Sequence, residues 1–507
     1  MYNSGKITLS MIVRNEEKYL RECLESVKDI VGEMVIVDTG STDGTVLIAK
    51  EYGASVYGYE WKDDFSAARN YALSKCTGKW ILYMDADERL SKHSAAEIKK
   101  IISGDNFTGR RCIVNNLDDF NGKPNFMRYT RLFPNDPEVK FSGAVHEQID
   151  ESLLAQGYDI IDSGIEIIHV GYNVPGEEIK NKAQRNLNLL LKEYEKNKSS
   201  YNAFQLANTF SILKDYVNAR KYYMISVGGC DLKNEYASHA YLNLSDYELR
   251  NHAPGKALEY INQGLMHDST NPQLNLLAAD IFFRLKRRDG IIDFCKSAYL
   301  ENNKILSGRN KAFLSVGLNT EAVLCKGIYY SLLTGDENAL QYFLVELDKK
   351  NRKLFNIFGK IIGEGEFSAA DKKELKNIIS EDNLDAVLVL LENDSDKQRA
   401  LDLATAVKET FKGNSKYLKT LGLLYSENNM LGEAESIFEE SLTLEEKDPA
   451  AVFYLISVLI QSNRLEKIPE LLSFAEKEFG RIPEFNSGFE LLKGKLDILF
   501  NNQQLLK

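Results

Sequence analysis

The first 90 residues alternate between short apolar runs and longer segments in which apolar residues recur at helical spacing. Uninterrupted apolar runs are typical of buried strands, and recurrence at every third or fourth position is typical of amphipathic helices. The pattern predicts strands at 6–13, 33–40, 54–61 and 79–87, and helices at 15–30, 41–53 and 64–76. This β-α-β-α-β-α-β order indicates a parallel sheet, whose ligands bind at the carboxyl ends of the strands. Asp38, Asp85 and Asp87 stand at such ends.

Residues 105–170 contain short β-like runs separated by polar turns, and they predict a mixed-sheet extension that completes the domain. From residue 174 onward the pattern becomes helical. Four positions are each followed by similar residues at offsets of +3, +12 and +16, namely Ala207, Ser245, Ala279 and Gly422. This spacing resembles tetratricopeptide repeats, in which small residues let paired helices approach and large residues fill the groove between them. Residues 300–400 fit poorly and are expected to be either degenerate repeats or an unrelated helical insert.

Composition narrows the class of protein. The formal net charge is -11 and no basic block stands out, so nucleic acid is not expected as a partner. The six cysteines are scattered without a C-x-x-C pair, which argues against zinc ribbons and disulfide frameworks and fits a reducing compartment. We find no signal-peptide pattern and no apolar run long enough for a membrane span, so a cytoplasmic location is expected.

The stretch Asp85-Ala86-Asp87 closes the fourth predicted strand. Side chains one residue apart at a strand end point the same way, and two carboxylates aimed alike repel unless a cation lies between them. A hard divalent ion such as Mn²⁺ or Mg²⁺ takes oxygen ligands and leaves positions open for substrate phosphates. A solvated turn that stops the strand is the simpler alternative. The position after four strands favours the metal.

Two other loops carry candidate ligands. Asp38 ends the second strand, where its carboxylate could bind a nucleobase or ribose, but a well-capped turn would explain Asp38 and Asp43 equally well. Arg69 falls in the first turns of the third helix, five residues after Asp64. Arg69 could bind a diphosphate or pair with Asp64, and a separation of five residues is poor for helical pairing.

Together these residues resemble family 2 glycosyltransferases with the GT-A fold. The resemblance runs in order over the first 190 residues. It begins with Asn15-Glu16-Glu17 after the first strand and continues through the motifs VDTGSTDGT, DFSAARN, DAD, RLF, FSGAVHEQI, HVGY and RNL. It extends to enzymes that join such a domain to tetratricopeptide repeats, including those that glycosylate peptide bacteriocins of the glycocin type. The resemblance implies an inverting transferase using a nucleotide-diphosphate sugar, with Asp38 and Asp64 at the nucleoside and Asp85 and Asp87 at the metal.

Three further residues are weighed on physical grounds. His169 ends a β-like run, and its imidazole would be a good third metal ligand, as in similar enzymes, or a buried histidine bonded to a backbone carbonyl. Glu147 is the candidate general base that takes the acceptor's proton, with Asp150 as a weaker rival. His146 could orient a phosphate or the acceptor. The structural alternative for Glu147 and His146 is a salt bridge with Arg128 or Arg131. Arg69 or Arg131 could share the charge that develops on the diphosphate.

The predicted fold is an α/β GT-A (Rossmann-like) catalytic domain, 1–175, followed by an all-α tetratricopeptide-like array. The array is divided into repeats at 176–300, a helical region at 301–400 and C-terminal repeats at 401–507. A long concave surface suits an extended peptide or protein acceptor, and it would serve a homodimer equally well. The predicted activity is transfer of a hexosyl or N-acetylhexosaminyl group, with UDP as the expected nucleotide. The alternatives are a transferase acting on a lipid-linked or cell-envelope glycan, and a repeat scaffold with an inactive transferase domain.

Overall fold

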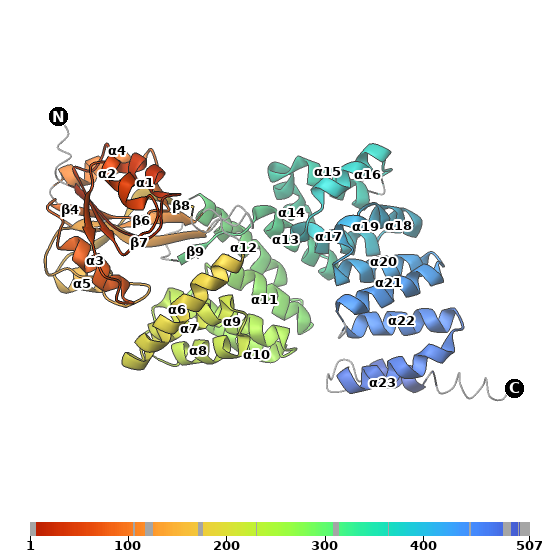
Figure 1. Cartoon of the computed structure of the whole chain (residues 1–507). Helices are drawn as coiled ribbons and strands as arrows, with labels where there is room; N and C mark the ends of the chain where they lie inside the picture. Colours follow the sequence, from red (N-terminus) through yellow and green to blue (C-terminus); the bar gives the residue numbers. More distant parts are fainter. Residues whose placement is uncertain are drawn as a thin grey trace. The chain divides into compact units, whose positions relative to one another are not determined.

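The computed structural model describes residues 7–104, 107–116, 125–170, 176–229, 231–307, 314–363, 365–445, 448–479, 488–494 and 496. The chain divides into two compact units, Met1–Thr320 and Glu321–Lys507. The first unit holds a mixed sheet and the first helical repeats, and the second unit is helical (Figure 1). This division differs from the predicted domain ends at 175, 300 and 400.

The parallel part of the sheet follows the predicted order. Its strands lie in the order β3-β2-β1-β4, and all neighbouring pairs are parallel. The central strands are buried along most of their length, as their uninterrupted apolar sequences require. Helices cross between them, so that the elements are β1 (Ile7–Val13), α1 (Leu20–Val27), β2 (Glu33–Asp38), α2 (Thr45–Glu51), β3 (Ser55–Gly58), α3 (Phe65–Leu73) and β4 (Trp80–Tyr83).

The second half of the sheet is mixed, as predicted. Strand β7 pairs antiparallel with β4 and with β6, β6 pairs parallel with β8, and β8 pairs antiparallel with β5. The sequence pattern did not predict β5, α4 or α5. The elements are β5 (Glu88–Leu90), α4 (Ser94–Ser103), β6 (Gly109–Asn116), β7 (Asn125–Pro134), α5 (Asp150–Ala155) and β8 (Ile160–His169).

One strand of the sheet comes from far along the chain. Strand β9 (Leu314–Val316) pairs antiparallel with the first residues of β7. Residues 314–316 lie in a region that the sequence predicted to be helical throughout. Strand β9 follows helices α6 to α12 in the chain, so the first repeats stand, in sequence, between two parts of one sheet.

The helices of the first unit form antiparallel neighbours with small buried residues at their contacts. Ala207, Ala219, Ala257 and Ala279 are all buried, which confirms the role that the repeat spacing gave to small positions. The helices are α6 (Gly176–Lys196), α7 (Ser200–Ile212), α8 (Tyr216–Gly228), α9 (Asn234–Arg250), α10 (Pro254–His267), α11 (Pro272–Arg284) and α12 (Ile291–Leu306).

In the second unit, a small residue on one helix again packs against a large residue on the next, and this contact occurs at two places. A Cβ at Gly422 would lie 2.6 Å from the Phe438 ring, and one at Gly327 would lie 2.5 Å from the Phe343 ring. Both glycines precede their phenylalanine by 16 residues, so residues around 327 are a repeat that the sequence analysis missed. The elements are α13 (Thr320–Thr334), α14 (Glu337–Lys350), α15 (Arg352–Ile362), α16 (Ala369–Ile378), α17 (Glu381–Glu392), α18 (Lys397–Ala406), α19 (Lys408–Phe411), α20 (Ser415–Glu427), α21 (Leu431–Leu444), α22 (Pro449–Gln461), the 3₁₀ helix η2 (Leu465–Lys467) and α23 (Ile468–Phe479).

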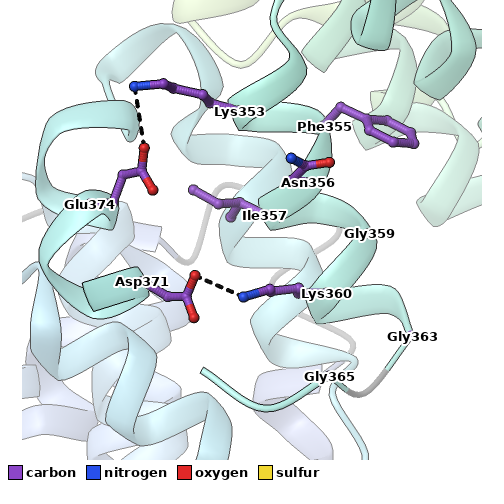
Figure 2. A pocket seen from close by; sticks show the side chains of 10 residues that line it. All are labelled: Lys353, Phe355, Asn356, Ile357, Gly359, Lys360, Gly363, Gly365, Asp371 and Glu374. Atoms are coloured by element: carbon purple, nitrogen blue, oxygen red, sulfur yellow. Dashed lines mark ion pairs between the residues drawn. The ribbon is translucent and has the colours of Figure 1, made fainter. Parts of the chain in front are cut away.

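A pocket of about 510 Å³ lies in the second unit between α15 and α16 (Figure 2). Its two lysines are paired with its two acids: Lys360 Nζ lies 2.7 Å from Asp371, and Lys353 Nζ lies 3.4 Å from Glu374. The four charged side chains of the pocket thus neutralise one another in pairs. Among the described helices, none combines the length and the apolar composition needed to cross a bilayer.

Candidate active site

The two aspartates of the DAD motif lie in a turn and not on the strand. Strand β4 ends at Tyr83 and β5 begins at Glu88, so Asp85 and Asp87 occupy the connection between them. The expectation that both carboxylates point the same way as alternate residues of a strand is therefore wrong. Asp85 faces two arginines, and Asp87 faces a histidine. The turn splits the motif into two neighbouring subsites.

The subsite at Asp85 is a cluster of buried charges. Arg69 Nη2 lies 2.8 Å from Asp85 Oδ1, and Arg69 also pairs through Nε with Glu147. Arg131 Nη2 lies 2.6 Å from Glu88 Oε1 and 3.8 Å from Asp85 Oδ2. Side-chain exposure is 8% for Arg69, 7% for Arg131 and 1% for Glu88. Strands β4, β5 and β7 and helix α3 each deliver part of this cluster, which the sequence could not pair in advance.

Both arginines also contact the ring of Tyr83. The Arg131 and Arg69 guanidinium carbons lie 4.2 Å and 5.0 Å from the centre of its ring. Such contacts stabilise a cation that has lost most of its water. Burial raises the pKa of Asp85, but the charges of Arg69 and Arg131 outweigh it and hold that pKa well below its usual range. Burial raises the pKa of Glu88 to about 7 in spite of Arg131.

The guanidinium of Arg131 has N–H donors that its ion pairs do not use. Within the described part of the chain, its buried Nε and Nη1 have no hydrogen-bond partner. Buried donors are almost always satisfied in folded proteins, so these two N–H groups are unusual and a ligand oxygen could complete them. A guanidinium fork matches phosphate geometry particularly well. This observation supports the expected role of Arg131 toward a diphosphate.

The subsite at Asp87 has the chemistry of a metal ligand set. His169 Nε2 lies 3.1 Å from Asp87 Oδ2, and Nδ1 lies 2.7 Å from Asn116 Oδ1. The amide oxygen and the carboxylate oxygen only accept, so both ring nitrogens donate in this arrangement, Nδ1 to Asn116 and Nε2 to Asp87. A bound metal would take the place of the Nε2 proton, and Nδ1 would keep its own. Such an outer hydrogen bond fixes the tautomer of metal-binding histidines. Burial lowers the pKa of His169, and the hydrogen bond and charge of Asp87 raise it above its ordinary value overall.

Asp87 and His169 are side chains of the kind that bind a divalent ion, but the two do not make a complete ligand set. The carboxylate and the imidazole face each other, and the binding of a metal by Asp85, Asp87 and His169 stays a prediction. Asp85, the third predicted ligand, is turned toward the arginines. Among the described residues, no group of three or more His, Cys, Asp or Glu side chains is arranged to hold a metal ion. Asp85 would have to leave Arg69 in order to join.

Glu147 and His146 lie on a loop that is tightly held against α3. Ser142 and Gln148 exchange two backbone hydrogen bonds of 2.9 Å, and the Asn70 side chain bonds both backbone groups of Phe141. Glu147 pairs with Arg69, and not with Arg128 or Arg131 as the structural alternative supposed. His146 adopts a left-handed backbone with φ 56°, and its side chain is exposed. The pairing brings Glu147 into the same cluster as Asp85.

The carboxylates of Asp38 and Asp64 both accept hydrogen bonds from nearby backbone N–H groups. The Asp38 carboxylate accepts hydrogen bonds from the Gly40 and Ser41 backbone N–H groups at 3.1–3.2 Å. Asp64 caps α3 by accepting a 2.9 Å hydrogen bond from the Ala67 N–H. Arg69 does not pair with Asp64, so the simpler alternative for that arginine is wrong. Binding of a nucleoside by Asp38 and Asp64 stays a prediction.

The sequence analysis named Glu16 in the family resemblance but gave it no role in the site. Glu16 follows the end of β1, and Asp38 ends the neighbouring strand β2. A carboxylate at the carboxyl end of a strand was the sequence signal that could have identified Glu16. Burial, followed by the charges of Asp87 and Asp85, raises the pKa of Glu16 to about 7. The charges of the DAD turn therefore act on Glu16. The HVGY motif was also singled out, but Gly171 and Tyr172 lie outside the described residues.

Residues 8–160 match the model of glycosyl transferase family 2. The N-terminal part of the chain is therefore a family 2 glycosyltransferase domain, as the motifs predicted. A TPR repeat-containing protein of Synechococcus elongatus is 43% identical over 151 residues, which are 30% of this chain and 37% of that protein. The glycosyltransferase SunS of Bacillus subtilis is 36% identical over 186 residues, 36% of this chain and 44% of SunS. The chain thus spans less than half the length of these relatives.

Solved structures give weaker likenesses. Staphylococcus aureus TarS 1-349 in complex with UDP-GlcNAc is 15% identical, with a TM-score of 0.29, and covers 61% of this chain and 93% of its own. A tetratricopeptide repeat protein from Parabacteroides merdae is 12% identical, with a TM-score of 0.39, and covers 58% of this chain and 98% of its own.

Proposed function

We propose that this chain is an inverting glycosyltransferase that uses a divalent metal ion and a UDP-linked sugar. The observation that carries the proposal is the juxtaposition, at the carboxyl edge of the sheet, of Asp87 with His169 and of Asp85 with two buried arginines. One subsite offers ligands for a cation, and the other offers donors for an anion. A nucleotide-diphosphate sugar with its metal needs both. The family 2 match of residues 8–160 supports the same reaction class.

In the proposed reaction, a carboxylate removes the acceptor's proton while the acceptor attacks the anomeric carbon. The new bond forms as the bond to the diphosphate oxygen breaks, and the electron pair leaves with the diphosphate. A metal held by Asp87, His169 and Asp85 would supply positive charge to that leaving group. Arg131 donates its unpaired N–H groups to the same oxygens. Glu147, positioned by Arg69, is the proposed general base.

The proposed acceptor is a peptide or protein side chain. The support is architectural: helical repeats follow the catalytic sheet, and they offer an extended surface suited to a polypeptide. SunS, which shares 36% identity over 186 residues, is itself named a glycosyltransferase. The proposal leaves the transferred sugar and the accepting atom to experiment.

A donor screen tests the proposal. UDP-glucose, UDP-N-acetylglucosamine, UDP-galactose and GDP-mannose are incubated with the full chain, with and without Mn²⁺, and sugar release is measured. We expect Mn²⁺-dependent turnover of one UDP-sugar, lost by orders of magnitude in Asp87→Ala. Glu147→Gln should lose about 10²–10⁴-fold in transfer to an acceptor. Near-normal turnover by Glu147→Gln would retire Glu147 as the base. A folded chain that binds no donor would move the function to the repeats.

A further inference from the structure

Strand β9 covers a part of β7 that the neighbouring strand β4 does not reach. On one edge of β7, β4 pairs with residues 132–134 and β9 pairs with residues 125–127, while β6 lies along the other edge. Among the described strands, only β9 pairs with residues 125–127 on the edge shared with β4. Unpaired strand edges expose backbone N–H and C=O groups, and strand ends open easily. Strand β9 therefore stabilises the beginning of β7.

The backbone pairing that starts at β9 continues in one line across five strands. In the order β9, β7, β6, β8 and β5, the residues paired with one another are Val316, Asn125, Asn116, His169 and Glu88. We call this line the His169 rung. Each of its members is the first or the last residue of its strand. The rung therefore lies where the sheet would open first, and β9 closes one end of it.

The His169 rung holds two side chains of the subsite at Asp87. His169 Nδ1 lies 2.7 Å from Asn116 Oδ1, and His169 Nε2 lies 3.1 Å from Asp87 Oδ2. An outer hydrogen bond such as the one to Asn116 orients an imidazole that binds a metal. Because Asn116 and His169 are neighbours in the rung, their hydrogen bond depends on β6 and β8 staying paired at their last residues.

Strand β9 is attached to the first repeats by one buried side chain. Asn302 of α12 is fully buried and bonds both backbone groups of Leu318, two residues after the strand. Its Nδ2 donates to the Leu318 carbonyl at 2.9 Å, and its Oδ1 accepts from the Leu318 N–H at 2.7 Å. A strand of three residues is as short as strands usually are, so β9 needs such support from its surroundings.

We propose that Asn302 is a positioning residue for the donor site, and that it acts on His169 through β9 and the His169 rung. The inference rests on the proposed function, in which His169 binds the metal that accompanies the donor diphosphate. Once Asn302 no longer holds β9, the rung opens more often at β7 and β6, and the imidazole is held less firmly. The repeats thus support donor binding through a residue that does not touch the donor.

The gain in UDP affinity that Mn²⁺ brings is the quantity that tests the inference. UDP is titrated into the full chain with Mn²⁺ and with EDTA, and the ratio of the two dissociation constants is taken. Asn116→Leu removes the partner of His169 and should reduce this ratio by about 10- to 100-fold. Asn302→Leu acts one step further away and should reduce it by about 3- to 10-fold. UDP affinity in EDTA should stay the same in both variants.

Hydrogen exchange of the same proteins shows whether the rung has loosened. In Asn302→Leu, peptides covering 109–116 and 125–134 should exchange faster than in the wild type. Asn302→Asp is a milder second variant, because its carboxylate still accepts from the Leu318 N–H but cannot donate to the Leu318 carbonyl. It should change both measurements in the same direction by smaller amounts, and it serves if Asn302→Leu does not fold.

Asn275→Leu is the matched control. Asn275 is a buried asparagine of α11 that also makes two hydrogen bonds to backbone groups, the carbonyls of Ser269 and Asn271. These carbonyls belong to the chain just before α11, so the substitution should leave the Mn²⁺-dependent ratio unchanged.

Three results would overturn the inference while leaving the proposed function intact. The first is faster exchange in Asn302→Leu with an unchanged ratio, which would make β9 a structural element only. The second is unchanged exchange, and the third is an equal fall of the ratio in Asn275→Leu, which would indicate general loosening of the repeats. A wild-type chain whose UDP affinity does not respond to Mn²⁺ would overturn the proposed function, and this inference with it.

Discussion

The carboxyl edge of the sheet and the contacts between the repeat helices are built on different physical principles. At the edge, Arg131 and Glu88 are buried as a pair of charges, 7% and 1% exposed. In the second unit, Gly422 and Phe438 meet with no polar group between them. Burying a charge costs free energy, and a buried charge is stable only while its partner is present. A contact between apolar groups needs only side chains of the right volume and shape. The difference indicates that the edge is retained for chemistry and the repeats for packing.

The largest effect is expected from removing one member of the buried pair. Arg131→Leu leaves Glu88 buried without its 2.6 Å partner, and breaking such a pair costs about 3–5 kcal/mol of unfolding free energy. The double variant Arg131→Leu/Glu88→Leu should recover most of that loss, because it also removes the Glu88 carboxylate that Arg131→Leu leaves buried without its partner. Denaturant unfolding of the full chain, followed by a probe of the sheet, measures both.

The activity of the double variant sharpens the comparison. If the pair is kept for chemistry, the double variant is folded but has lost donor turnover. A double variant as unstable as Arg131→Leu would mean that the charges, and not their pairing, hold this part of the sheet together. In that case the edge would be a structural device, and the contrast with the repeats would fail.

The sequence could predict local order better than long-range partners. The strands, the crossover helices and the repeat spacing all depend on residues near one another in the chain, and the structure confirms them. The partners of Arg69 could not be predicted, because Asp85 and Glu147 are 16 and 78 residues away. Strand β9 could not be predicted either, since its pairing with β7 joins residues almost 190 positions apart.

Two misses had a signal in the sequence. The +3, +12 and +16 offsets of the repeat at Gly422 also hold from Gly327, where they give Tyr330, Ala339 and Phe343. The poor fit of the region 300–400 as a whole hid this one repeat. The position of Glu16 after β1 matches that of Asp38 at the end of β2. In contrast, nothing local indicated that β4 ends at Tyr83, because Met84 continues its apolar run.

A medium effect is expected at the shape-built contacts. Replacing a helical glycine with alanine ordinarily stabilises a helix by about 0.5–1 kcal/mol. At Gly422 the new Cβ would lie 2.6 Å from the Phe438 ring, and such overpacking costs about 1–3 kcal/mol. Gly422→Ala should therefore destabilise α20 and α21. Hydrogen exchange of peptides covering 415–444 in the full chain measures the change.

Gly432→Ala is the matched control, because nothing lies within 4 Å of the Cβ it would add on α21. It should slow hydrogen exchange slightly, in the opposite direction to Gly422→Ala. Opposite signs would confirm that shape sets the stability of this contact. Stabilisation by both substitutions would show that Phe438 moves freely, and the repeats would then be less tightly specified than the charged edge.

The smallest effect is expected at the seam where the two regions meet. Gln148 Nε2, next to Glu147, donates a 3.1 Å hydrogen bond to Tyr201 Oη on α7. Tyr201→Phe removes an acceptor worth about 1 kcal/mol, so donor transfer should slow about five-fold with little change in donor KM. Tyr216→Phe, at an exposed position on α8, should change neither value. If Tyr201→Phe transfers at the wild-type rate, the repeats only pack against the catalytic loop. A loss confined to kcat would instead make Tyr201 a positioning residue. Through Tyr201, helix α7 would then hold in place the loop that carries Glu147, the proposed general base.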